Sequence, residues 1–141
     1  MRKITQFAVA HPWLCDVIGH LNTRHYHGMF DDTLFVLLDE LGYPAATAHG
    51  SGVAFVDVRN ELEYRAEVVS GAVVRIQAYI EKIGTKSITA FFSMTTLDGA
   101  KIHATMRAVL VSSNVIAKKA IEVPADARSR ARVFLHESDS T

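Results

Sequence analysis

The sequence predicts an α+β fold in which a curved antiparallel sheet wraps around one long helix. Two observations carry the prediction. Apolar residues between positions 26 and 41 recur with a helical period of about 3.6 residues, and from Gly52 onward the pattern changes to the two-residue alternation of strands. Each of the four strands after Gly52 is expected to hold about 11–13 residues and to be on the order of 40 Å long, whereas a helix of about 20 residues spans roughly 30 Å. Strands longer than the helix beside them are expected to curve around it.

The elements are expected in the order strand, helix and four strands. Asn22 or Thr23 stands at the position of a helix N-cap, and Gly42 supplies the stop of the helix. Pro124 is expected to start a helical tail at about residues 124–135. The strands are expected at residues 3–10, 52–64, 73–83, 86–97 and 100–113.

Two local features of these strands are predicted in more detail. Asp98-Gly99 is a hairpin signal, because a type I′ turn needs positive φ at both central positions. Within residues 52–64, alternation separates two faces of the strand. One face is expected to hold Ala54, Val56, Val58, Asn60, Leu62 and Tyr64, and the other Asp57, Arg59, Glu61 and Glu63.

Length and composition indicate one globular domain over residues 1–141, with its core at about residues 3–113. Hydrophobic residues make up 49% of the chain and charged residues 21%, which excludes the intrinsically disordered class. The net charge of +0 argues against a nucleic-acid-binding protein, whose phosphate contacts need a basic excess. The single cysteine, Cys15, excludes an internal disulfide and a cysteine-based zinc site.

Neither a targeting signal nor a membrane span is expected. The first residues carry two positive charges, but Gln6, His11 and Asp16 interrupt any apolar signal region. The longest apolar run, residues 34–38, is far shorter than the roughly 18 residues of a membrane span. We therefore expect a cytoplasmic protein with no membrane partner.

Reactive side chains gather between residues 16 and 32, around the expected start of the helix. A helix N-terminus presents unpaired N–H groups and a partial positive charge, so it can stabilise an oxyanion by about 3–4 kcal/mol per good donor. Asp16 lies a few residues earlier, where its carboxylate can act as a general base on water or attack directly. Structural alternatives stay open: Asp16 as a loop-forming residue, His20 as a hydrogen-bonding residue of that loop, and Asn22 as a plain N-cap.

The sequence gives less support to a metal site, a cysteine nucleophile or a serine nucleophile. His27 and Asp31 form an i, i+4 pair, but His25 lies about 200° from His27 around a helix. Two ligands do not make a zinc site, so no metal is expected. An acid beside Cys15 makes its thiol harder to ionise, which favours a buried structural thiol. Ser51 precedes a strand rather than a helix, so it does not fit a nucleophile elbow.

The residues around Asp16 form a pattern that extends into the helix: Cys15-Asp16-Val17-Ile18-Gly19-His20-Leu21-Asn22, then Tyr26, then Phe30-Asp31-Asp32. This pattern resembles the hotdog-fold acyl-CoA thioesterases of the 4-hydroxybenzoyl-CoA thioesterase type. The order of strand, long helix and four long strands extends the resemblance over residues 3 to about 113. The resemblance implies hydrolysis of an acyl-CoA thioester to the free acid and CoA, without a metal or redox cofactor.

The resemblance also implies catalytic roles for single residues. Asp16 matches the family's base or nucleophile toward the thioester carbonyl. The backbone amides from Gly19 to Thr23 match the oxyanion hole at the start of the helix. His20 and Asn22 match motif positions that shape the loop and hydrogen-bond substrate or water, and we expect them in the catalytic site with Asp16.

Substrate contacts and assembly are expected from the same region. Tyr26 matches a helix position that faces the acyl pocket of the family, and aromatic side chains such as Trp13 and Phe30 can line a pocket. The expected substrate-binding residues are Gly19, Thr23, Tyr26, Trp13 and Phe30. The family's usual assembly is a homodimer joined through the sheet edges, often paired into a homotetramer, with active sites at subunit interfaces.

The substrate is defined less closely than the reaction. No fixed motif marks the residues for the phosphates of CoA, and the candidates are Arg59, Arg65, Arg75, Lys82 and Lys86. The sequence of residues 15–26 is similar to that of thioesterases associated with carnitine breakdown. This similarity implies a short betainyl-type acyl group as one candidate. The alternatives are an acyl-CoA hydratase or dehydratase on the same fold, and a non-catalytic module that binds acyl-CoA or an acyl carrier protein.

Overall fold

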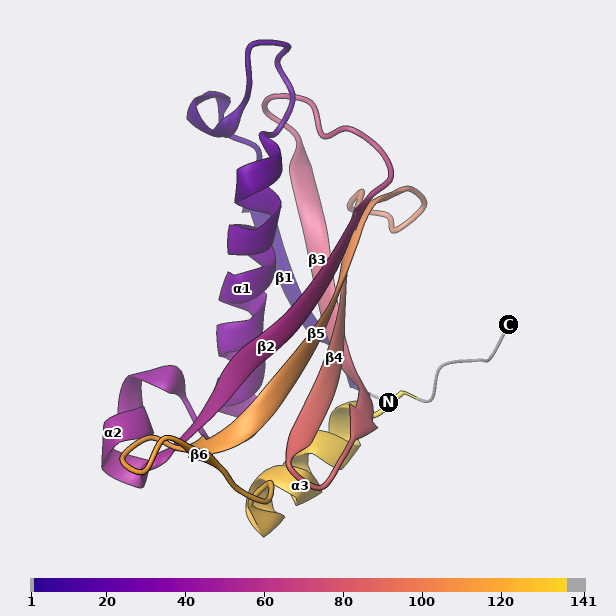
Figure 1. The fold of residues 1–141 in the computed structure, drawn as a ribbon. Helices are drawn as coiled ribbons and strands as arrows, with labels where there is room; N and C mark the ends of the chain where they lie inside the picture. Colours follow the sequence, from indigo (N-terminus) through magenta and orange to yellow (C-terminus); the bar gives the residue numbers. More distant parts are fainter. Residues whose placement is uncertain (1, 137–141) are drawn as a thin grey trace.

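The computed structural model describes residues 2–136 and shows a curved antiparallel sheet beside one long helix (Figure 1). The helices are α1 (Thr23–Glu40), α2 (Ala48–Ser51) and α3 (Ala125–Ala131), with the 3-10 turns η1 (Pro12–Leu14), η2 (Ala45–Thr47) and η3 (Arg132–Phe134). The strands are β1 (Ile4–Val9), β2 (Val53–Tyr64), β3 (Val73–Ile83), β4 (Ser87–Thr95), β5 (Ile102–Asn114) and β6 (Lys119–Ala120). The predicted α+β class and the order of strand, helix and four strands are confirmed.

Helix α1 begins and ends where its local sequence requires. The Asn22 side chain accepts a hydrogen bond from the N–H of Arg24 at 3.1 Å, which makes Asn22 the N-cap. Gly42, with a φ of 84°, follows the last turn and reverses the chain. The apolar stripe is buried as its spacing predicts, at Tyr26, Phe30, Thr33, Leu34, Leu37 and Leu38.

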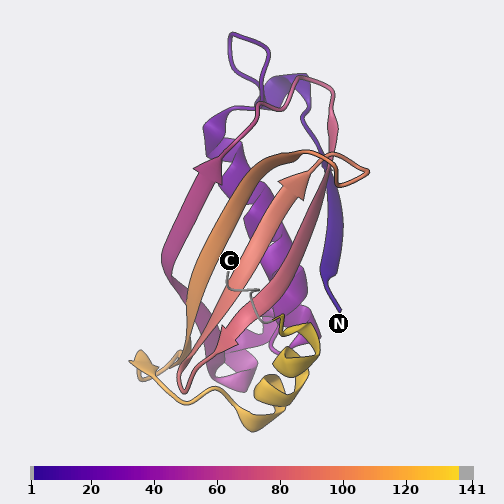
Figure 2. The same cartoon turned by 90° about the vertical axis from the view of Figure 1, so that its right-hand side faces the viewer.

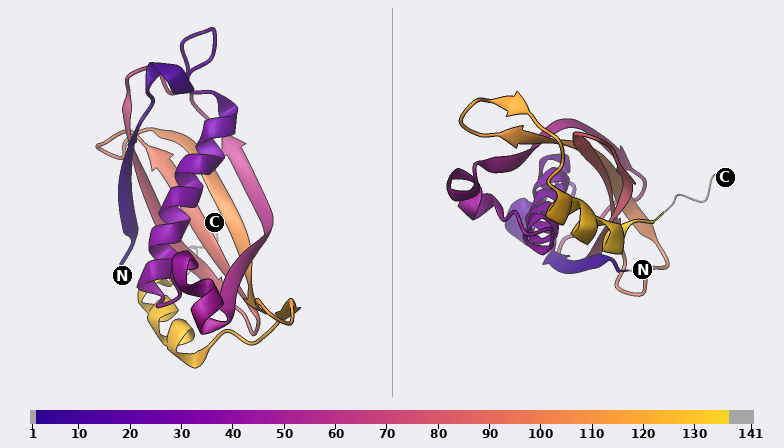
Figure 3. Two further views of the ribbon diagram at one scale, coloured as in Figure 1. Left: turned by 90° about the vertical axis from the view of Figure 1, so that its left-hand side faces the viewer. Right: turned by 90° about the horizontal axis from the view of Figure 1, so that it is seen from below.

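The strands form one antiparallel sheet in the order β1-β3-β4-β5-β2, with β6 paired to β5. Figure 2 shows α1 behind the strands, and the view from below in Figure 3 shows the sheet curving around it. Phe30 of α1 packs on Phe92 of β4, with the ring centroids 6.0 Å apart and both side chains fully buried. The core therefore lies between the helix and the middle strands, and β1 and β2 form the two edges of the sheet.

Strand β2 departs from the predicted alternation at a β-bulge between Asp57 and Arg59. β2 has one extra residue at the bulge. The side chains that face the helix before the bulge are therefore the ones that the predicted alternation placed on the other face. Val56 and Val58 are 47% and 60% exposed, so the prediction that they share the face of Leu62 is wrong. Asp57 lies toward the helix instead, where burial raises the pKa of its carboxyl group.

The hairpin between β4 and β5 is also wider than predicted. Gly99 has a φ of 77°, but Asp98 is not among the residues with positive φ, so the turn is not type I′. The N–H of Thr96 donates to the carbonyl of Lys101 at 3.0 Å, and Asp98 Oδ1 accepts the N–H of Ala100 at 3.0 Å. This side-chain hydrogen bond supports a four-residue loop, in which only the glycine needs a left-handed conformation.

The tail after β6 packs against the end of the fold that lies opposite the start of α1 (Figure 1). Ala127, Ala131 and Phe134 are buried there. The Arg128 guanidinium donates to the carbonyl of Gly84 at 2.8 Å, which ties α3 to the turn between β3 and β4. The tail is helical in α3 and η3, and its packing closes this end of the core.

A second link holds the tail to the chain that follows α1. The Tyr43 hydroxyl donates to Asp126 Oδ1 at 2.8 Å, and this hydrogen bond holds the pKa of Asp126 below its ordinary value. A lowered pKa in the folded state means that the bond stabilises the fold above the ordinary carboxyl pKa. Its contribution is lost as the pH falls through the lowered value.

Replacing Tyr43 with Phe is therefore expected to lower the free energy of unfolding by about 0.5–1 kcal/mol at pH 7, because the hydrogen bond lies at the surface. At about pH 3 the difference from the wild type should be smaller, since part of the Asp126 population is then protonated. Urea denaturation of both proteins at the two pH values measures this. An equal loss at both would contradict the assigned role of Asp126.

Candidate functional site

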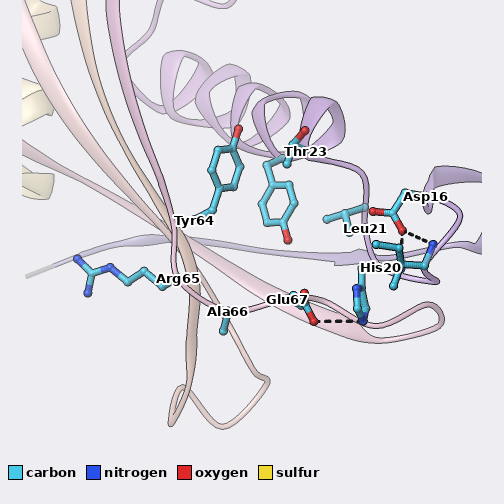
Figure 4. A pocket seen from close by; sticks show the side chains of 10 residues that line it. Asp16, His20, Leu21, Thr23, Tyr64, Arg65, Ala66 and Glu67 are labelled. Atoms are coloured by element: carbon cyan, nitrogen blue, oxygen red, sulfur yellow. Dashed lines mark hydrogen bonds and ion pairs between the residues drawn. The ribbon is translucent and has the colours of Figure 1, made fainter.

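A cavity of about 280 Å³ lies where the loop before α1 meets the end of β2 (Figure 4). The loop supplies the chain from Asp16 to Leu21, the first turn of α1 supplies Thr23 and Tyr26, and the chain at the end of β2 supplies residues 64–67. The lining residues are Asp16, Ile18, His20, Leu21, Thr23, Tyr26, Tyr64, Arg65, Ala66 and Glu67. The cavity thus joins the reactive segment of the sequence to a segment that follows it by many residues.

Asp16 is held in this loop by the backbone N–H groups that follow it. Its Oδ1 accepts from the N–H of Ile18 at 2.9 Å and from the N–H of His20 at 3.2 Å. Gly19, with a φ of 86°, allows the chain to turn back so tightly. The N–H of His20, followed by that of Ile18, holds the pKa of Asp16 below its ordinary value. Asp16 is therefore ionised at neutral pH.

Most backbone amides around the start of α1 are already used. The N–H of Gly19 donates to Asp16, that of Leu21 to Val68 and that of Asn22 to Leu14, while the N–H of His20 binds the Asp16 carboxylate. The N–H of Arg24 binds the Asn22 side chain.

Thr23, the first residue of α1, differs from these neighbours. Its N–H has no hydrogen-bond partner among residues 2–136. A first helical residue has no carbonyl to bond within its own helix. Of the amides from Gly19 to Thr23, that of Thr23 alone is therefore available to a ligand, and Thr23 borders the cavity.

Two tyrosines form an aromatic part of the cavity wall. Tyr26 of α1 and Tyr64 of β2 pack edge to face, with their ring centroids 5.1 Å apart. Tyr26 is 4% exposed, and burial raises the pKa of its hydroxyl group, which therefore stays protonated. The pair gives the cavity an apolar wall beside the polar loop.

The other predicted site residues lie outside this lining. Asn22 acts as the N-cap of α1, and Gly19 provides the turn of the loop. Trp13 is 74% exposed and stacks on the ring of His11, with the centroids 4.3 Å apart. Phe30 is fully buried against Phe92, because it belongs to the helix stripe that faces the sheet. Neither aromatic side chain borders the cavity.

The structure also separates the candidates for phosphate binding. Arg65 borders the cavity and pairs with Glu63 at 3.2 Å, and both side chains are more than half exposed. Arg59 pairs with Glu61 at 2.6 Å on the edge strand. Arg75, Lys82 and Lys86 lie on β3 and the turn after it and do not border the cavity.

The remaining reactive side chains have structural partners. His27 hydrogen-bonds to the side chain of Asn60 at 3.0 Å. The Cys15 thiol lies 3.4 Å from the carbonyl oxygen of His11. Within residues 2–136, no three His, Cys, Asp or Glu side chains come close enough together to hold a metal ion. No helix in that range is long and apolar enough to cross a membrane.

Glu67 is the functional-site candidate that the sequence did not reveal. It lies in the cavity wall with its Oε2 3.2 Å from His20 Nε2. No local motif marks it, because its position depends on how the chain after β2 returns to the loop before α1. The N–H of Leu21 donates to the carbonyl of Val68, and the N–H of Ser70 to that of Gly19, which brings the two segments together.

Several solved structures share this fold. A hypothetical protein from Staphylococcus aureus, solved in complex with CoA, matches with a TM-score of 0.90 at 16% identity, over 99% of this chain and 89% of that one. A 1,4-dihydroxy-2-naphthoyl-CoA thioesterase from Synechocystis matches with a TM-score of 0.82 at 12% identity, over 93% and 96%. A gentisyl-coenzyme A thioesterase matches with a TM-score of 0.78 at 17% identity, over 90% and 98%. At these identities the matches show that the fold is that of the hotdog thioesterases.

A sequence family supports the same assignment. The search of curated protein sequences found no significant match. The model of the thioesterase-like superfamily matches residues 10–131, which is most of the chain and includes the whole cavity lining. The protein therefore belongs to the thioesterase-like superfamily, which confirms the expected family and the expected enzyme class of thioester hydrolase.

Proposed function

We propose that the protein hydrolyses an acyl-CoA thioester to the free acid and CoA in the cavity at the start of α1. One observation carries the proposal: an ionised carboxylate, Asp16, and an unused helix-start amide, that of Thr23, border the same cavity. Acyl transfer needs a nucleophile or base on one side of a carbonyl and a donor for its oxygen. The other amides from Gly19 to Asn22 are occupied, and Val17 does not border the cavity, which narrows the proposed oxyanion donor to Thr23.

In the proposed reaction, the thioester carbonyl oxygen accepts the N–H of Thr23. Asp16 either removes a proton from a water molecule that attacks the carbonyl carbon, or attacks that carbon itself to form an anhydride that water then hydrolyses. In both routes a C–O bond forms at the carbonyl carbon and the C–S bond breaks. CoA leaves as a thiolate and takes up a proton that comes from the hydrolytic water. The His20 side chain hydrogen-bonds to the water beside Asp16, and Asn22 holds the start of the helix.

The assignment of CoA as the carrier rests on the relatives and on one side chain. Among the structural neighbours, one was solved with CoA and two are named as thioesterases of aromatic CoA esters. Arg65 lies at the cavity border with its guanidinium group exposed to solvent. There it can bind a phosphate of CoA through charge-assisted hydrogen bonds while the phosphate stays in contact with water. We therefore propose that the acyl end lies against Tyr26 and Tyr64, and that the nucleotide extends past Arg65.

Product analysis over a panel of acyl-CoA esters tests this function. Short, long, aromatic and betainyl esters would be incubated with the protein, and free thiol and acyl products would be measured together. Release of CoA and free acid from at least one ester is expected. Addition or loss of water on the acyl chain with the thioester intact would indicate a hydratase or dehydratase, and binding without product would indicate a non-catalytic module.

We further propose a homodimer joined through β2, with a homotetramer built from two such dimers. The outer edge of β2 has no strand partner within the chain that the structure describes. An open edge of twelve residues with two exposed valines is suited to pairing with a second copy. The cavity residues Tyr64 and Arg65 lie at the end of this edge, so a partner paired there would border the cavity.

Replacing Val58 with Glu is expected to weaken this dimer. Val58 lies near the middle of β2, so antiparallel pairing of two copies would bring the two new carboxylates together. Sedimentation velocity should show a shift toward monomer, with turnover falling in proportion. The control is Ile116→Glu. Ile116 lies in the turn before β6 and is 84% exposed, so this change should leave the assembly unchanged. A V58E variant that sediments like the wild type would contradict the proposed interface.

A further inference from the structure

We propose that Glu67 is a positioning residue of the thioesterase site, which fixes the His20 ring with its proton on Nε2. Nδ1 is then left to accept a hydrogen bond from the hydrolytic water. This inference rests on the proposed function for the role of the water. The fixed orientation of the ring rests on the contact between the two side chains alone.

The contact determines which nitrogen of His20 carries the proton. Nε2 lies 3.2 Å from Glu67 Oε2, and the two side chains face each other across the cavity wall (Figure 4). An ionised carboxylate only accepts hydrogen bonds, so the Nε2 that faces it must carry the proton even when the ring is neutral. Nδ1 has no partner within residues 2–136 and remains an acceptor.

The backbone presents this pair to the cavity in a fixed geometry. His20 and Val69 form an antiparallel bridge, flanked by the hydrogen bonds from Leu21 to Val68 at 2.8 Å and from Ser70 to Gly19 at 2.9 Å. His20 and Glu67 are therefore carried by two segments that are already paired through their backbones. Bringing the two side chains together costs less conformational entropy than it would for an isolated surface pair.

The same loop relates the His20 ring to the Asp16 carboxylate. The N–H of His20 donates to Asp16 Oδ1 at 3.2 Å, so the ring and the carboxylate are attached to one tight turn. The other oxygen of Asp16, Oδ2, has no hydrogen bond to any part of the chain that the structure describes. A water that donates one hydrogen to Oδ2 and one to Nδ1 keeps a lone pair for attack on a carbonyl held by Thr23. The general-base route proposed above uses such a water.

A purely structural role for Glu67 would have a different signature. Its side chain is 73% exposed, and exposed ion pairs contribute little to folding. Removing the carboxylate should therefore leave the thermal midpoint nearly unchanged. Turnover and the protonation pattern of the His20 ring should change instead.

Two variants of Glu67 and one matched control test the proposal. Glu67→Ala removes the hydrogen-bond acceptor, and Glu67→Gln removes the charge but keeps an acceptor. Glu63→Gln makes the same change of charge at a side chain that is 67% exposed and does not border the cavity. For Glu67→Ala we expect kcat to fall about tenfold with little change in KM, less than the loss on removing a direct base. Glu67→Gln should lose less, and Glu63→Gln should keep the wild-type kcat.

The ring nitrogens of His20 give a readout that does not depend on activity. In ¹⁵N NMR spectra recorded at a pH where the ring is neutral, wild-type His20 should carry its proton on Nε2, and Glu67→Ala should show a mixture of both tautomers. Identical nitrogen shifts in the two proteins, or turnover of Glu67→Ala within twofold of the wild type, would overturn the proposal. A wild type that hydrolyses no ester would instead contradict the proposed function, and the NMR result would still decide the orientation of the ring.

Discussion

Replacing Asp16 with Asn should reduce kcat for acyl-CoA hydrolysis by about 10²–10⁴-fold, the contribution of a positioned base. The amide keeps the shape of the side chain and can still accept the N–H groups of Ile18 and His20, so the loop should keep its conformation. It has neither the negative charge nor the basicity needed to activate water or attack a thioester. Thiol release measures the loss, and calorimetry with CoA should show binding close to that of the wild type.

Asp98→Asn is the matched control for this experiment. Asp98 also sits in an exposed loop, accepts a backbone N–H through Oδ1 and has a lowered pKa, caused chiefly by the Thr96 hydroxyl. It does not border the cavity. D98N should hydrolyse thioesters at the wild-type rate, and a D16N protein that does so as well would contradict the assigned role of Asp16.

The pH profile follows from the lowered pKa of Asp16. The carboxylate is the active form, so activity is present above the Asp16 pKa and is lost as the pH falls through it. We expect the acidic limb of kcat/KM that belongs to Asp16 to lie below the ordinary Asp value of about 3.9. The limb would be absent from the residual activity of D16N.

Replacing Thr23 with Pro should reduce kcat by about 10²–10³-fold, the usual effect of losing one oxyanion donor. At the first position of a helix, proline removes a backbone N–H that makes no intrahelical bond, so the helix keeps all its own hydrogen bonds. The backbone accepts the change, since Asn22 already has the extended conformation, with φ of −67° and ψ of 137°, that a residue before proline requires.

Thr23→Ala separates the amide from the side chain, because it removes the hydroxyl and keeps the N–H. T23A should retain most of the wild-type turnover, and circular dichroism should show the same helix content in both variants. If T23P kept its activity, or if T23A lost as much as T23P, the donor would not be the Thr23 amide.

The features that the sequence predicted correctly are local ones. Asn22 caps the helix that its spacing predicts, and the apolar stripe that follows it is buried. The Asp16 loop was recognisable for the same reason, because its turn is made by hydrogen bonds between residues two and four positions apart. Such interactions depend on neighbouring residues, which the sequence displays directly.

The features that it did not predict depend on pairing between distant segments. The bulge at Val58 is a property of the pairing between β2 and β5, and alternation alone cannot show where the extra residue falls. Glu67 reaches His20 because the order of the strands returns the chain to the loop before α1. Phe30 lies within the recognised motif, but its side chain is fully buried in the core.

The most direct test of the central claim is a crystal structure of the D16N variant with an acyl-CoA ester that it hydrolyses slowly. We expect the thioester carbonyl oxygen at about 2.7–3.1 Å from the backbone nitrogen of Thr23. The carbonyl carbon, or a water in contact with it, should lie at about 3–3.5 Å from the side chain at position 16. A thioester bound outside the cavity, or one whose carbonyl points away from the start of α1, would contradict it.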